Sequence, residues 1–205
     1  MRDPVDPDPS PSRYRSATRP PPRIALRARE DDAAREAPAE SFPISDGRRL
    51  SLRPIRPGDA DALRRAFARL TPDQVRLRLF HRMNELSREA AARMTQVDPD
   101  TTVAYVVVDG DDEIRGEARM HVDAVTATAE FAVAVDPQFT HLGIGRRLMR
   151  RLIDEARRRG VTELWGDVLA QNQTMLSFAK ALGAERHAAP DEPGITRVVI
   201  RVDGR

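Results

Sequence analysis

The stretch from Glu130 to Ala184 constrains the fold of this 205-residue chain more than any other part of the sequence. It reads EFAVAVDPQFTHLGIGRRLMRRLIDEARRRGVTELWGDVLAQNQTMLSFAKALGA, which predicts an apolar strand, a glycine-bearing turn and a long basic amphipathic helix. A second strand, a turn led by Asn172 and a second helix follow. The glycines stand where the turn becomes the helix, so backbone N–H groups at the positive end of the helix dipole can approach an anion. This arrangement is typical of a phosphate site, and here it adjoins a strand that carries the carboxylate of Glu130.

Composition narrows the class of protein. The chain has no cysteine, which excludes an acyl-cysteine intermediate, a thiolate metal site and a disulfide framework. It shows neither the basic start and apolar run of a secretory signal nor an apolar segment of the roughly 20 residues that cross a bilayer. The net charge of +2 is too small to indicate a nucleic-acid partner. We therefore expect a cytoplasmic protein with no membrane partner.

The chain divides into a tail and one domain. Residues 1–40 are rich in Pro and Arg and have no sustained apolar period, which predicts a disordered tail. The arginines from Arg13 to Arg29 lie between acidic flanks and leave two interpretations open. They form either a docking arm for an acidic partner or RNA, or a solvated, self-compensating polyampholyte. We expect a single folded domain over residues 41–205.

The pattern within that domain predicts an α/β protein. Strands are expected at residues 50–55, 102–109, 114–122, 127–135, 163–169 and 195–202, and helices from Gly58 onward and at residues 71–80, 87–96, 143–159 and 173–182. Pro54 indicates that the first of these strands lies at a sheet edge or ends there, and Trp165 is expected in the core. Consecutive strands followed by alternating helix and strand predict a mixed sheet covered by helices on both faces.

The turn before the long helix carries the residues with the clearest chemistry. Gly143 and Gly145 let the backbone come close to a bulky anion, although two glycines alone could equally serve only the turn. Arg146 and Arg147 oppose the helix dipole, so they do not serve helix stability, and we expect them to neutralise phosphates. For Arg150 and Arg151, one turn later, phosphate binding and ordinary solvated surface are equal alternatives.

The pattern V-x-P-x-x-x-x-x-G-I-G-R-R-L-M from Val135, followed by N-x-x-M-L-x-x-A-x-x-L-G-A from Asn172, resembles the GCN5-related N-acetyltransferases (GNATs). The resemblance implies that the loop binds the pyrophosphate of acetyl-CoA through backbone amides. It also implies that the pantetheine arm lies where two parallel strands part, at residues 131–135 and 168–170. The residues implied to contact acetyl-CoA are Val133, Ala134, Val135, His141, Leu142, Gly143, Ile144, Gly145, Arg146, Arg147 and Asn172.

A narrower resemblance concerns the acceptor. The segment LRPIRPGDADALRRAFARLTPDQVRLRLFHRMNELSREAAARMTQVD is similar to the N-terminal half of the acetyltransferase domain of bacterial protein lysine acetyltransferases. GDVLAQNQTMLSFAKALGA is similar to the second half of that domain. Those enzymes modify an active-site lysine of acyl-CoA synthetases. The resemblance therefore implies transfer of an acetyl group from acetyl-CoA to a lysine of an acyl-CoA synthetase-like protein.

Glu130 is the candidate general base, because it matches a strand glutamate used by this branch of the family. A lysine ammonium, with a pKa of about 10.4, must lose a proton before it can attack a thioester. Apolar neighbours in the strand would desolvate the carboxylate and raise its pKa. Strand alternation also allows a glutamate that merely faces solvent, and Glu117, one strand earlier, is the reserve candidate.

Several positions depart from the family pattern. Thr140 stands where the family usually has Gln or Arg, with His141 next to it. The tyrosine that often acts as general acid maps onto Ala179, so a proton for the leaving thiolate would come from water or another group. Asn172 can cap the last helix, bind the pantetheine or an ordered water, or do both. The histidines His81, His121 and His187 lack ligand spacing, and we predict no metal.

These residues favour direct transfer in a ternary complex, with Glu130 as base. Two other functions stay open at this point. One is acetylation of a small amine such as a polyamine, an amino acid or an antibiotic. The other is a non-catalytic acyl-CoA-binding sensor, which the substitutions at Thr140 and Ala179 allow.

Overall fold

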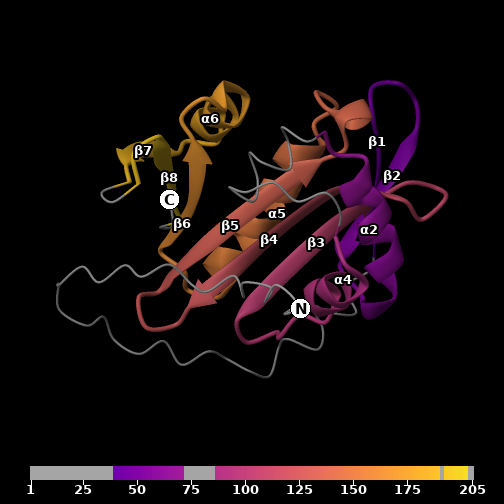
Figure 1. Ribbon diagram of the computed structural model, residues 1–205, viewed down its shortest axis with the longest axis horizontal. Coiled ribbons are helices and arrows are strands. Elements are labelled where there is room, and N and C mark those ends of the chain that lie inside the picture. The colour runs from indigo at the N-terminus through magenta and orange to yellow at the C-terminus, as the bar shows by residue number, and fades with distance from the viewer. Residues whose placement is uncertain (1–38, 72–85, 190–191, 203–205) are drawn as a thin grey trace, which may run out of the picture.

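The computed structural model describes residues 39–71, 86–189 and 192–202. Its centre is an 8-stranded sheet in the order β1-β2-β3-β4-β5-β6-β8-β7 (Figure 1). The strands are β1 (Glu40–Pro43), β2 (Arg49–Pro54), β3 (Thr102–Val108), β4 (Ile114–Asp123), β5 (Thr128–Val135), β6 (Glu163–Leu169), β7 (Glu185–Ala188) and β8 (Ile195–Arg201). Neighbouring strands are antiparallel except β5 and β6, which run parallel. The predicted mixed sheet is confirmed.

Helices cover both faces of this sheet, as the sequence predicts. One face packs against η1 (Pro57–Asp59), α2 (Ala60–Ala68) and α4 (Arg88–Thr95). The other packs against α5 (Ile144–Arg158) and α6 (Gln173–Ala181), and the short turn η2 (Pro137–Phe139) joins β5 to α5. Alternate residues of β3 serve the two layers, since Tyr105 belongs to the α5 side and Val106 to the α2 side.

The position of α5, which follows the glycine-bearing turn, depends on an apolar stripe along the helix. Its buried apolar residues recur at helical spacing, and they are Ile144, Leu148, Met149, Leu152, Ile153 and Ala156. Arginines occupy most of the opposite face. On the other side of the sheet, the Ser87 hydroxyl accepts a hydrogen bond from the Ala90 N–H at 3.1 Å and so caps α4.

The structure differs from the predicted elements at a few places. β1 and β7 were not predicted, because only Phe42 is buried in β1 and every residue of β7 is exposed. β1 covers the outer side of β2, so Pro54 marks the end of that strand and not an edge of the sheet. The predicted tail 1–40, except for its last two residues, and the predicted helix 71–80, except for Thr71, lie outside the described residues.

The expectation that Trp165 lies in the core is wrong. Its side chain is half-buried and faces away from α5, because strand alternation puts its neighbours Leu164 and Gly166 on the buried side of β6. The consequence for the site is described below.

The contact between α5 and the sheet should dominate stability. Leu152 is fully buried between them, so Leu152→Ala should lower the free energy of unfolding by about 2–5 kcal/mol through lost burial and an unfilled cavity. Urea denaturation measures this loss. The matched control is Val125→Ala in the β4–β5 turn, where the side chain is 72% exposed and little change is expected. Equal losses in both variants would contradict the packing described here.

Candidate active site

The parallel strands β5 and β6 stay paired for only three residue pairs, the last of which joins Glu130 to Trp165. Beyond it both strands continue, to Val135 and Leu169, without pairing to each other. β6 remains paired with β8 along its whole length and turns away from β5 (Figure 1). The β6-facing backbone groups of residues 131–135 therefore lack a strand partner, which suits an extended ligand with amide groups of its own.

The two strands are packed tightly at the point where they part. A Cβ added to Gly166 would lie 3.1 Å from the carbonyl oxygen of Phe131 and 3.2 Å from its ring. A larger residue at position 166 would therefore push β6 away from β5. The two strands thus remain in close contact one residue after their last pair, Glu130 with Trp165.

The loop after β5 leads into the exposed start of α5. Gly143 is the N-cap residue and adopts a left-handed conformation with φ of 81°, which a glycine tolerates best. No side chain caps this end within the described part of the chain, and the first helical hydrogen bond runs from the Arg147 N–H to the Gly143 carbonyl at 3.1 Å. The N–H groups of Ile144, Gly145 and Arg146 are therefore available to an anion at the positive end of the helix.

Neighbouring residues fix the shape of this loop. The Thr140 hydroxyl donates to the Pro137 carbonyl at 3.0 Å, so this side chain braces the loop from within. His141 is exposed and has a positive φ of 62°. Leu142 packs against the core, and Gly145 faces the Phe178 ring of α6, which an added Cβ would meet at 3.4 Å.

The arginines after the loop differ in their contacts, and the sequence did not reveal this difference. The Arg147 guanidinium pairs with Glu40 and lies 4.1 Å from the centroid of the Phe42 ring, both of them in β1. These partners hold Arg147 toward β1 in this conformation, and its role in neutralising a phosphate stays a prediction. Arg146 is exposed, and Arg151 lies over the ring of Tyr105.

Glu130 stands in a row of side chains that crosses the sheet on the face opposite α5. Its direct neighbours across the strands are His121 of β4 and Trp165 of β6. The Glu130 side chain reaches solvent, yet the surrounding protein removes part of the water from the carboxyl group and raises its pKa. The Asp167 carboxylate raises this pKa further, while Arg197 and His121 oppose the shift.

Trp165, Asp167 and Arg197 form a cluster beside Glu130. Arg197 of β8 donates to both carboxylate oxygens of Asp167, at 2.8 and 2.6 Å. The same guanidinium lies 4.1 Å from the centroid of the Trp165 ring. The pair therefore fixes the indole next to Glu130. Sequence reasoning missed this cluster, because only the pairing of β6 with β8 brings the three side chains together.

The remaining candidates are placed as follows. Glu117 is buried, is ion-paired with Arg119 on β4, and lies directly opposite Ala134 of β5 in the sheet. The Asn172 side chain accepts a hydrogen bond from the Met175 N–H at 3.0 Å, which confirms its capping role and leaves its contact with pantetheine a prediction.

No described tyrosine lies where the strands part. Ala179, where the family's tyrosine maps, is fully buried in the core. Tyr105 is in the middle of β3, and burial raises its pKa to about 12. Among the described residues, no group of three or more His, Cys, Asp or Glu side chains could hold a metal ion, and no helix is long and apolar enough to span a membrane.

Residues 63–184, more than half of the chain, match the sequence profile of the acetyltransferase (GNAT) family. The chain belongs to this family. It is 30% identical over 162 residues to acetyltransferase PA5475 of Pseudomonas aeruginosa, a match that covers 78% of this chain and 86% of that protein. A shorter match, 43% identical over 53 residues, is to the [ribosomal protein bS18]-alanine N-acetyltransferase of Escherichia coli and covers 26% of this chain and 36% of that one.

Solved structures agree on the fold. The GNAT domain of S. lividans PAT superposes with a TM-score of 0.72 at 23% identity, covering 80% of this chain and 96% of that domain. At such identity the likeness shows the fold alone. Together with the relatives, family membership makes this chain an N-acetyltransferase, and GNAT enzymes use acetyl-CoA as the acetyl donor.

The electrostatics of Glu130 can be measured directly in this GNAT protein. A carboxyl ¹³C NMR titration should place its pKa above the value of about 4.3 for an ordinary glutamate. Asp167→Asn removes the nearby negative charge and leaves Arg197 without that partner, so the pKa of Glu130 should fall. Asp154→Asn on α5, where the side chain is 62% exposed, is the control and should leave the titration unchanged. A Glu130 pKa that does not respond to Asp167→Asn would refute this account of its environment.

Proposed function

We propose that this enzyme transfers the acetyl group of acetyl-CoA to the ε-amino group of a lysine in a protein such as an acyl-CoA synthetase. The reaction would be a direct transfer in a ternary complex, with Glu130 as general base. The observation that carries this proposal is the position of Glu130 at the last paired residue before β5 and β6 part.

Two neighbouring parts of the chain would bind the coenzyme: the start of α5 and the unpaired backbone of β5. The free N–H groups at the start of α5 would bind the pyrophosphate, with the loop residues His141 and Leu142 beside it. The unpaired backbone of Val133, Ala134 and Val135 would hold the pantetheine amides and the thioester carbonyl. When bound, acetyl-CoA supplies the thioester that the amine attacks.

The acceptor amine would approach from the face that carries Glu130. Its nitrogen must lose a proton to become nucleophilic, and Glu130 accepts that proton directly or through one water. A raised pKa brings a carboxylate closer to the pH at which it works as a base. The nitrogen then forms the amide bond as the bond from the acetyl carbon to sulfur breaks. The nitrogen gives up a second proton, and a water molecule donates a proton to the departing thiolate.

Three observations favour a protein acceptor. The segments of residues 52–98 and 166–184 resemble protein lysine acetyltransferases. Glu130 reaches solvent and so could meet a side chain presented by a folded protein. One relative by sequence is named for acetylating a ribosomal protein. Another relative is named L-amino acid N-acyltransferase, which keeps a small amine as the competing acceptor.

The test is incubation with labelled acetyl-CoA and an AMP-forming acetyl-CoA synthetase. We expect label on the synthetase and a loss of about 10²–10⁴-fold in kcat for Glu130→Gln, the range for a removed general base. The matched control is Glu163→Gln, because Glu163 lies in β6 at the same paired segment and forms an exposed ion pair with Arg201. It should keep wild-type activity.

Other results separate the alternatives. Label on a polyamine or an amino acid but not on the synthetase would favour the small-amine reaction. Binding of acetyl-CoA with no turnover on any amine would favour the sensor. Equal activity of Glu130→Gln and wild type would remove Glu130 from the mechanism.

A further inference from the structure

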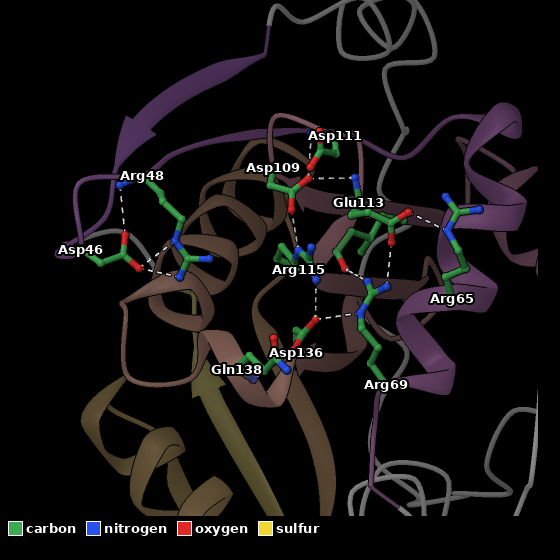
Figure 2. A network of polar contacts seen from close by, with 11 residues as sticks. Asp46, Arg48, Arg65, Arg69, Asp109, Asp111, Glu113, Arg115, Asp136 and Gln138 are labelled. Atoms are coloured by element: carbon green, nitrogen blue, oxygen red, sulfur yellow. Dashed lines mark hydrogen bonds and ion pairs between the residues drawn. The ribbon is translucent and has the colours of Figure 1, made fainter.

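A partly buried ion network joins the C-terminal end of α2, the β3–β4 hairpin and the loop that precedes α5 (Figure 2). We refer to residues 136–143 as the coenzyme loop. At its first position, directly after β5, stands Asp136, whose side chain is only 2% exposed. The chemistry proposed above does not use this carboxylate. A buried charge is costly unless it is fully paired, so its retention at this place calls for a reason.

Both oxygens of the Asp136 carboxylate are engaged. Oδ2 accepts hydrogen bonds from Nε of Arg69, the C-cap residue of α2, at 2.8 Å and from Arg115 Nη1 of β4 at 3.0 Å. Oδ1 accepts from the Gln138 N–H at 3.0 Å and so closes the first turn of the coenzyme loop. The Asp136 carbonyl accepts from the Phe139 N–H at 2.8 Å. One side chain thus links the loop backbone to two separate elements of the fold.

Contacts that do not involve Asp136 also hold Arg69 and Arg115 in place. Arg69 donates to Glu113 at 2.7 Å and to the Ile114 carbonyl at 2.7 Å. Arg115 donates to Asp109 at 2.7 Å. Because each guanidinium is fixed by contacts that do not involve Asp136, neither can follow the loop if it moves.

Arg115 also contacts the loop at a second point. Phe139 is 2% exposed, and the guanidiniums of Arg115 and Arg48 lie 4.8 and 4.2 Å from its ring centroid. Arg48 is bound in turn by Asp46 (Figure 2). The first half of the coenzyme loop is therefore anchored at positions 136 and 139, and residues 140–143 lead from this anchor to the start of α5.

We propose that Asp136 is a positioning residue for coenzyme A: held by Arg69 and Arg115, it sets the place of the loop that carries Gly143 and the N–H groups after it. This inference rests on the coenzyme site proposed above. Hydrogen bonds weaken steeply with distance and angle, so a small shift of the loop would weaken several bonds to the pyrophosphate together. The paired guanidiniums also neutralise Asp136, so its charge does not repel the coenzyme.

The test measures coenzyme A affinity by calorimetry and acetyl transfer by steady-state kinetics. Asp136→Asn keeps the size of the side chain and removes its charge. It should raise the Kd for coenzyme A and the KM for acetyl-CoA by about tenfold, while kcat stays within about twofold, because the catalytic groups are untouched. A Kd equal to that of wild type would overturn the inference.

A matched control separates positioning from general stability. Asp59→Asn also removes a buried carboxylate, one that accepts two hydrogen bonds from Arg53, at 2.7 and 2.8 Å, and one from the Arg56 N–H at 2.7 Å. It lies at the start of α2 and does not contact the coenzyme loop. It should lower Tm and leave the Kd unchanged. An equal rise in Kd in this control would show that Asp136 acts only through stability.

A second variant guards against a failure of Asp136→Asn to fold. Arg69→Gln alters a side chain that is 26% exposed and should raise the Kd by about threefold. The double variant should bind no more weakly than Asp136→Asn alone, since Arg69 acts through Asp136. Additive effects, or wild-type affinity in Arg69→Gln, would overturn the inference. Failure of the wild-type protein to bind coenzyme A would instead refute the coenzyme site itself.

Discussion

The rest of the structure depends on the short pairing between β5 and β6. This is the parallel contact of an otherwise antiparallel sheet, and it ends at Glu130 and Trp165. β5 leads through η2 into α5. The unpaired end of β5 and the exposed start of α5 are therefore close together in the chain. An extended, phosphorylated coenzyme could therefore contact both at once. Glu130 lies where the two strands part, on the face of the sheet opposite α5, and an acceptor could reach it there.

Internal ion pairs hold the parts of this site in register. Arg69 and Arg115 hold Asp136 at the start of the coenzyme loop, and Arg197 joins Asp167 beside Glu130. These arginines are largely shielded from solvent, so their charges act mainly within the protein. Arg69, Arg115 and Arg197 thus connect strands, helices and loops that are distant in sequence.

Local signals in the sequence were sufficient for most of the elements. The apolar stripe of α5, the continuous apolar run of β3 and the turn led by Asn172 each carried their own periodicity or cap. β1 and β7 had no such signal, because exposed edge strands gain their structure from a neighbouring strand and not from their own pattern. The partners of Arg147 were not predicted for the same reason, since Glu40 and Phe42 come from β1.

The sequence by itself determined the family pattern, the glycines at the start of α5 and the presence of a strand glutamate, because each is a local property of a few adjacent residues. Only the tertiary structure decided where β5 and β6 part, which arginines are already paired, and which side chains surround Glu130 and Asp136. Those outcomes depend on contacts between residues that are distant in sequence, as in the contact of Arg69 with Asp136 across 67 residues. Such long-range contacts leave no periodic trace in the sequence, because they are selected by the packing of the whole sheet.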